Sequence, residues 1–124
     1  MSYFRSRLRA FRYAFQGLAY LLRSQPNARI HATATLAVVA LAAWLALPLT
    51  SWALLVLAMG LVWSAEALNT ALEAAVDLAS PEIHPRAKEA KDAAAAGVLL
   101  AAFAAAVVGF LVLGPPLYAR LFAP

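Results

Sequence analysis

Three long apolar segments, at residues 30–47, 52–79 and 90–113, constrain the fold of this chain more than any other feature. The first carries no charged residue, and the second is wholly apolar through Trp63. A helix needs about 20 predominantly apolar residues to span the hydrocarbon core of a bilayer. The sequence therefore predicts an all-α integral membrane protein with three transmembrane helices, built as a single membrane domain over residues 1–124.

Residues 1–28, ahead of the first apolar segment, have the periodicity of an amphipathic helix. Apolar side chains recur at spacings of three and four, while most arginines fall on another face. The apolar positions are Phe4, Leu8, Phe11, Phe15, Leu18 and Leu22. The segment lacks the continuous apolar core of a cleavable signal peptide. We therefore expect a helix on the membrane surface, with its aromatic face in the lipid and its arginines among the head groups.

Basic residues are distributed unevenly along the chain, and this distribution predicts its orientation. Six arginines precede residue 30 without an acid among them, three more basic residues lie in the 80–92 loop, and the turn at 48–51 has none. Cytoplasmic loops of membrane proteins carry an excess of lysine and arginine, so the N-terminus and the 80–92 loop are expected in the cytoplasm. A membrane-surface segment accounts for the arginines, and no nucleic-acid partner is expected.

Four polar residues of the second span, Glu66, Asn69, Glu73 and Asp77, share one face of the predicted helix. At about 100° per residue they fall within an arc of roughly 80°. A carboxylate facing lipid is costly, so this stripe must face protein, ions or water. A salt bridge to lysine or arginine would account for one or two of the acids. It does not account for all three, because the spans themselves offer no cation. Metal ions, protons or the Mg²⁺ of a phosphorylated ligand remain as partners. Three thin helices are not expected to bury this face alone, and the alanine-rich spans favour close packing in an oligomer.

The chemistry of the individual side chains narrows the possibilities. Glu66 lies deepest in the span, where a buried carboxylate can accept a proton from a lipid alcohol. Glu73 offers the hard oxygen ligand that suits Mg²⁺. Lys91 can neutralise a phosphate, whereas Asp92 is explained equally well as a helix cap. His84 is more often a hydrogen-bonding loop residue than a ligand. The chain has no cysteine, which excludes disulfides and thiol chemistry.

The stretch from Glu66 to Asp77 resembles the E-x-x-N-x-x-x-E-x-x-x-D signature of the prokaryotic diacylglycerol kinase family, which includes the undecaprenol kinases. The resemblance covers roughly residues 8–113. Further matched blocks lie at residues 13–17, 27–31, 80–85 and 90–92. It implies a kinase of the bacterial inner membrane that uses ATP and Mg²⁺ to phosphorylate a membrane lipid alcohol. It also implies a homotrimer of three-span subunits, each with an amphipathic surface helix and with active sites between subunits.

The resemblance also implies roles for individual residues. Glu66 corresponds to the catalytic base and Asn69 to its neighbour, and both would meet the lipid substrate. Glu73 corresponds to a metal-binding glutamate that also meets the nucleotide. Gln25 stands where the family usually has a second metal-binding glutamate; its amide oxygen can bind Mg²⁺ but adds no charge. The remaining matches to nucleotide-site residues are Tyr13, Asp77, Glu82, His84, Lys91 and Asp92.

Two alternatives stay open from the sequence. The lipid alcohol is diacylglycerol or undecaprenol, and the 27–31 and 80–92 segments look somewhat more like the undecaprenol branch. The other alternative is a small ion- or proton-coupled transporter subunit that uses the acidic stripe as a relay. A relay predicts acids near the middle of the bilayer. Here the acids approach the basic loop, as a nucleotide site requires, so the kinase is the leading interpretation.

Overall fold

The computed structural model describes residues 2–122, which form four helices joined by short connections. Their bounds are α1 (Ser2–Ser24), α2 (Pro26–Trp44), α3 (Leu49–Ala79) and α4 (Pro85–Phe122). The description leaves out Met1, Ala123, Pro124 and the side chains of residues 2–4 and Ser6, so the predicted place of Phe4 on the apolar face lies outside it. The all-helical prediction is confirmed over the described residues.

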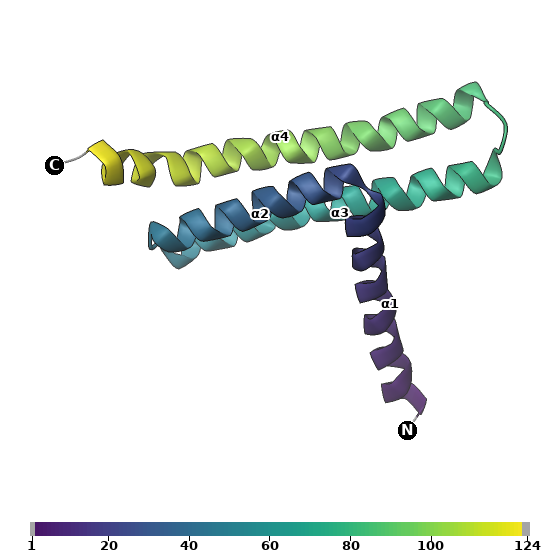
Figure 1. Ribbon diagram of the computed structural model, residues 1–124, viewed down its shortest axis with the longest axis horizontal. Helices are drawn as coiled ribbons and strands as arrows, with labels where there is room; N and C mark the ends of the chain where they lie inside the picture. The colour runs from purple at the N-terminus through teal and green to yellow at the C-terminus, as the bar shows by residue number, and fades with distance from the viewer. Residues whose placement is uncertain (1, 123–124) are drawn as a thin grey trace.

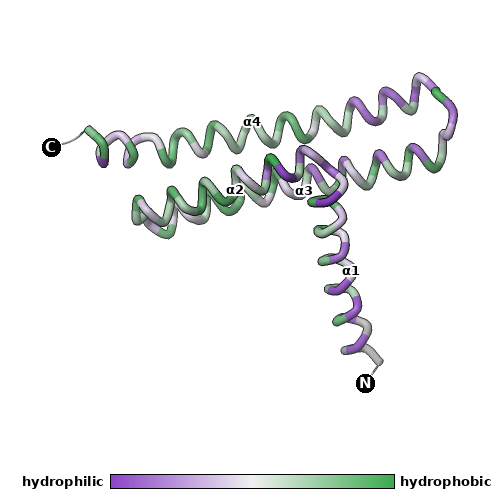
Figure 2. Tube along the Cα trace, in the orientation of Figure 1, coloured by the Kyte–Doolittle hydropathy of each residue, from purple (hydrophilic) through white to green (hydrophobic). Residues whose placement is uncertain are grey.

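Helices α2, α3 and α4 run side by side, whereas α1 leaves this bundle crosswise (Figure 1). Residues 80–84 connect α3 to α4, which run in opposite directions. The last part of α3 and the first part of α4 continue past the point at which α1 leaves. Figure 2 shows that these continuing ends are more hydrophilic than the rest of the bundle. Helix α1 therefore joins the bundle near the boundary between its longer apolar part and its shorter polar end.

The apolar surface of the bundle indicates a membrane protein. Among the described residues, α3 and α4 are long and apolar enough to cross a membrane, and only 17% of the most apolar window of each is buried. The core helix of a soluble protein would be mostly buried instead. Helix α2 has 19 residues and begins with the polar side chains of Asn27, Arg29 and His31. It does not reach the same hydropathy, so the third transmembrane helix stays a prediction.

The junction between α1 and α2 is built from one extended residue and one arginine. Gln25 precedes Pro26 and is extended, at φ −106° and ψ 116°, as expected for a residue before proline. Arg29 then donates hydrogen bonds from Nε to the carbonyl of Leu22 at 3.0 Å and from Nη2 to that of Arg23 at 2.5 Å. Carbonyls in the last turn of a helix lack intrahelical donors. Arg29 therefore ties the beginning of α2 to the end of α1.

Packing away from the acidic stripe holds α2, α3 and α4 together. Ala42, Leu55 and Leu113, one from each helix, form a buried apolar cluster. Further along, Trp63 donates a hydrogen bond from Nε1 to Thr35 Oγ1 at 3.1 Å, which joins α3 to α2. The small side chains of α4 allow it to pack closely along α3. The bundle thus gives α3 a defined face toward α2 and α4.

The end of α4 differs from the sequence prediction. The segment was expected to end near Leu113, ahead of Gly114 and the two prolines, but the helix continues to Phe122 with Pro115 and Pro116 inside it. A proline lacks a backbone N–H, so these two residues leave two carbonyls of the preceding turn without their usual donors. The helix also begins at Pro85, earlier than residue 90. Proline is well tolerated in the first turn of a helix because its N–H is not needed there.

Candidate active site

The acidic stripe of α3 passes from the interior of the bundle to its polar end. Glu66 is 1% exposed and Asn69 is 8% exposed, whereas Glu73 is half-buried and Asp77 is exposed. The single chain therefore buries the deeper half of the stripe, and the expectation that three helices could not do so was wrong for Glu66 and Asn69. His31 of α2 faces Glu66 and contributes to this burial. The shallower half lies open to water or to a partner.

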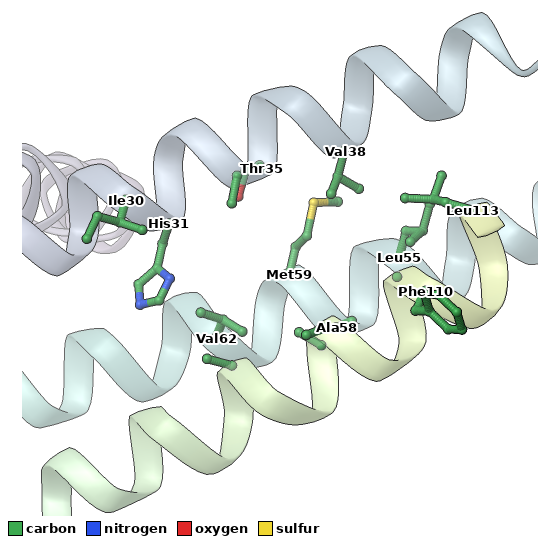
Figure 3. Close-up of a pocket in the computed structure, with 15 residues that line it drawn as sticks. Ile30, His31, Thr35, Val38, Leu55, Ala58, Met59, Val62, Phe110 and Leu113 are labelled. Atoms are coloured by element: carbon green, nitrogen blue, oxygen red, sulfur yellow. The ribbon is translucent and has the colours of Figure 1, made fainter. Parts of the chain in front are cut away.

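The Glu66 carboxylate lies opposite a histidine that sequence reasoning did not include in the site. His31 Nε2 on α2 is 3.9 Å from Glu66 Oε2, and neither atom has a hydrogen-bond partner. Figure 3 shows the His31 side chain extending from α2 between the helices, toward the level of Val62. A histidine in an otherwise uncharged span was the signal that could have identified it.

The next turn of α3 contains a hydrogen bond within the stripe. Asn69 Nδ2 donates to Glu73 Oε1 at 3.1 Å, which holds the amide and the carboxylate together. Asn69 Oδ1 and Thr70 Oγ1 are buried without a partner. Buried polar atoms are almost always hydrogen-bonded, so these free atoms mark a place where a further group is expected. Thr70 was absent from the predicted site, because a single threonine on a helix gives little sequence signal.

The polar end of the bundle brings together five predicted nucleotide-site residues. They line a shallow pocket of about 290 Å³ formed by the end of α3, the 80–84 loop and the start of α4. These residues are Asp77, Glu82, His84, Lys91 and Asp92. Lys91 forms an ion pair with Asp77, and Lys88 forms one with Asp92. Two lysines and two aspartates therefore meet in one open pocket.

Two predicted residues lie apart from these groups. Tyr13 on α1 is 65% exposed, and Gln25 is half-buried at the α1–α2 junction. Within residues 2–122, neither side chain makes a hydrogen bond or ion pair with the stripe. Helix α1 does approach α3, because the cavity between these helices is lined by Gly17 and Leu21 on one side and Thr70 on the other. Helix α1 thus lies beside the stripe, but Tyr13 forms no hydrogen bond with it.

A larger cavity of about 480 Å³ lies between α2, α3 and α4 (Figure 3). Its lining is apolar apart from His31 and Thr35, and it extends from there toward Phe110 and Leu113. None of the predicted site residues lines it.

The stripe offers oxygen atoms of the kind that a magnesium ion binds. Among the described residues, no group of three histidine, aspartate or glutamate side chains could hold a metal ion. Proteins usually hold Mg²⁺ with one or two carboxylates plus the phosphates of a substrate. Glu73, with the unpartnered oxygens of Asn69 and Glu66 on the same face, supplies hard donors of that kind. These donors therefore fit a magnesium ion that is held partly by the protein and partly by the phosphates of a substrate.

The fold and site together define an all-helical membrane protein in which one helix carries carboxylates from the bundle interior to a charged, open end. Comparison with known proteins gives the family. Residues 12–113 match the family described as prokaryotic diacylglycerol kinase. The match covers most of the chain, which therefore belongs to this family.

Individual relatives support the same assignment. The chain is 48% identical to a diacylglycerol kinase of Synechocystis sp. over 109 residues. These residues cover 87% of this chain but 62% of that protein. It therefore spans less than two thirds of that relative's length. It is 37% identical over 109 residues to the undecaprenol kinase of Bacillus subtilis, with 88% of this chain and 89% of the relative covered. The diacylglycerol kinase of Escherichia coli strain K12 is 32% identical over 106 residues, which cover 86% of this chain and 87% of that protein.

Proposed function

We propose that this chain transfers the γ-phosphate of ATP to the hydroxyl group of a membrane lipid alcohol, with Mg²⁺ as the metal ion. The observation that carries the proposal is the Glu66 carboxylate, which is 1% exposed and has an unpartnered oxygen on the stripe that leads to the charged end. A carboxylate buried among apolar helices can meet the head of a lipid. The family membership supports the reaction, and it sets aside the transporter alternative.

Glu66 and Asn69 are the residues proposed to act at the lipid. Phosphoryl transfer depends mostly on alignment of the attacking oxygen and on stabilisation of charge. Glu66 accepts the hydroxyl proton as the new oxygen–phosphorus bond forms and the bond to ADP breaks. A positioned general base contributes roughly 10²- to 10⁴-fold to the rate. Asn69, one turn away with a free Oδ1, is placed to orient the hydroxyl or a phosphate-bound group.

The open pocket at the polar end is the proposed nucleotide site. Lys91 and Lys88 are already held there by Asp77 and Asp92. Phosphate oxygens compete well for lysine, because each ammonium group has three donors and a full charge. Glu82, His84 and, from α1, Tyr13 complete the proposed set of nucleotide contacts.

Magnesium would be held by Glu73 together with the phosphates, and Gln25 would add an amide oxygen. The ion would neutralise phosphate charge during the transfer. The role of Glu73 is therefore binding, and it can be separated from the role of Glu66 in proton transfer.

The assembly and orientation are part of the proposal. We place α2, α3 and α4 across the bacterial inner membrane, with the N-terminus and residues 80–92 in the cytoplasm, because basic residues concentrate in these two segments. Three chains form a homotrimer with α1 on the membrane surface. The half-exposed Glu73 and the exposed Asp77 would then meet groups of a neighbouring chain.

The lipid alcohol is diacylglycerol or undecaprenol. The three relatives compared above are named for one or other of these substrates, and the one that is 48% identical to this chain is a diacylglycerol kinase. Purified protein in lipid nanodiscs, supplied with labelled ATP and each lipid in turn, measures the preference directly. Absence of phosphate transfer to either lipid would refute the proposed reaction.

The proposed roles of the two glutamates are tested by matched Glu→Gln variants. Glu66→Gln should retain binding of Mg²⁺ and a non-hydrolysable ATP analogue while kcat falls by roughly 100-fold or more. Glu73→Gln should weaken binding of the Mg²⁺–nucleotide complex first. Glu89→Gln is the control, because Glu89 is an exposed acid of α4 outside the proposed site. Near-normal kcat in Glu66→Gln, or loss of nucleotide binding in that variant alone, would contradict the assignment.

A further inference from the structure

The pair formed by His31 and Glu66 is unusual within this bundle. His31 is 16% exposed at its side chain and Glu66 is 1% exposed, and their facing atoms, Nε2 and Oε2, are both buried without a partner. Leaving a buried polar atom without a hydrogen bond costs stability, more so for a charged group. The 3.9 Å separation must shorten by roughly 1 Å for the two atoms to reach hydrogen-bond distance.

Among the described residues, the arginines and the amide nearest Glu66 are bonded elsewhere or exposed, and the other unpartnered donor on its face is the neutral hydroxyl of Thr70. On α2, the Arg29 guanidinium is bonded to the last carbonyls of α1. On α3, the Asn69 amide donates to Glu73. On α4, residues 93–119 carry no charged side chain, and the arginine of α1 nearest the junction, Arg23, is exposed. His31 is therefore the ring donor that the fold sets opposite this carboxylate, with Nε2 facing Oε2 from the neighbouring helix.

We propose that His31 is a positioning residue for the kinase reaction, an inference that rests on the proposed function. Its Nε2–H donates to Glu66 Oε2 and fixes the carboxylate plane. Glu66 Oε1 is then left for the lipid hydroxyl. During transfer the hydroxyl proton moves to Oε1, the lipid oxygen bonds to the γ-phosphorus, and the bond from phosphorus to ADP breaks. His31 keeps its own protons throughout and acts only through Glu66.

The contact itself can be tested without any activity measurement. The chain has two histidines, His31 and His84, so ¹⁵N-histidine labelling gives two sets of ring signals, and His84→Asn assigns them. In the full-length protein in nanodiscs, Glu66→Gln should shift the His31 ring nitrogens and leave those of His84 unchanged. Glu89→Gln should shift neither residue. Unchanged His31 signals in Glu66→Gln would overturn the proposal.

The kinetic consequence is tested with His31→Ala, His31→Gln and a control on the same helix. The free energy of a hydrogen bond to a charged group corresponds to a factor of roughly 10 to 100 in a rate constant. His31→Ala should therefore lower kcat by about that factor and leave the KM for ATP unchanged. His31→Gln keeps an N–H donor at similar reach and should recover part of the loss. Thr33→Ala is the control, because Thr33 is an exposed residue whose hydroxyl bonds only within α2.

A double-mutant cycle separates positioning from a structural role. If His31 acts through Glu66, His31→Ala should cost little further activity in a Glu66→Gln background. Equal loss in both backgrounds, or loss accompanied by a matching fall in thermal stability, would refute positioning. Wild-type protein that phosphorylates neither lipid would instead refute the proposed function, and the ¹⁵N experiment would still decide the His31–Glu66 contact.

Discussion

Arg29 should control how firmly α1 is held against the bundle. Its guanidinium donates to two carbonyls of the last turn of α1, at 3.0 Å and 2.5 Å. A hydrogen bond from a charged donor contributes about 1.5–3 kcal/mol when buried, but Arg29 is exposed, so we assign both bonds together about 1–2 kcal/mol. Arg29→Met should therefore lower the ratio of docked to undocked α1 roughly 5- to 30-fold. In Arg29→Lys the ratio of docked to undocked α1 should lie between those of wild type and Arg29→Met, because an ammonium group cannot donate to two carbonyls with the geometry of a guanidinium.

The absence of cysteine makes this change measurable by paired spin labels. Labels on cysteines at Ala10 in α1 and Leu49 at the start of α3, both exposed, report the distance from α1 to the bundle. The labelled chain is diluted with unlabelled chain in nanodiscs and examined by double electron–electron resonance.

The distance distribution should broaden in Arg29→Met. Arg23→Met removes the same charge near the same junction without removing either bond, and should leave the distribution narrow. Equal widths for Arg29→Met and wild type, or equal broadening in Arg23→Met, would refute the account of the junction.

Three further outcomes are expected. A cysteine at Thr50 should react with an impermeant reagent in spheroplasts and one at Ile83 should not, because the basic residues of the 80–92 segment predict that it is cytoplasmic; the reverse pattern would invert the topology. Gln25→Glu should lower the Mg²⁺ concentration needed for half-maximal activity, because it adds a charged oxygen ligand; an unchanged requirement would remove Gln25 from the metal site. Mixed oligomers of Glu66→Gln and Glu73→Gln chains should recover activity if each site draws on two chains, and no rescue at any ratio would mean self-contained sites.

Local features of the sequence predicted the four helices and the end of α3 at Ala79, whereas most of the other helix limits differ from the prediction by three or more residues. The break at Gln25 follows from the restriction that Pro26 places on its neighbour, and residues 80–84 are non-helical as the prolines at 81 and 85 predict. The grouping of Glu66, Asn69 and Glu73 on one face follows from helical periodicity alone. The end of α4 was not predicted, because the cost of two prolines within a helix depends on what surrounds it.

The family signature identified the charged residues of the site but not the partners that they find in three dimensions. Asp77 pairs with Lys91 and Asp92 with Lys88, so the lysines of the polar end are organised before any nucleotide arrives. Lys88 had no part in the predicted site. Its spacing from Asp92 is the i, i+4 spacing of helical ion pairs, and this was a usable signal.

The sequence by itself determined which residues lie on the same face of each helix, because that depends only on the rotation per residue along one chain segment. Only the tertiary structure decided how those faces meet, because the crossing and register of two helices depend on packing between side chains distant in the sequence. His31 and Glu66 show the difference. Each was visible as a polar residue in an apolar span, but the packing of α2 on α3 set their atoms 3.9 Å apart and buried both without another partner.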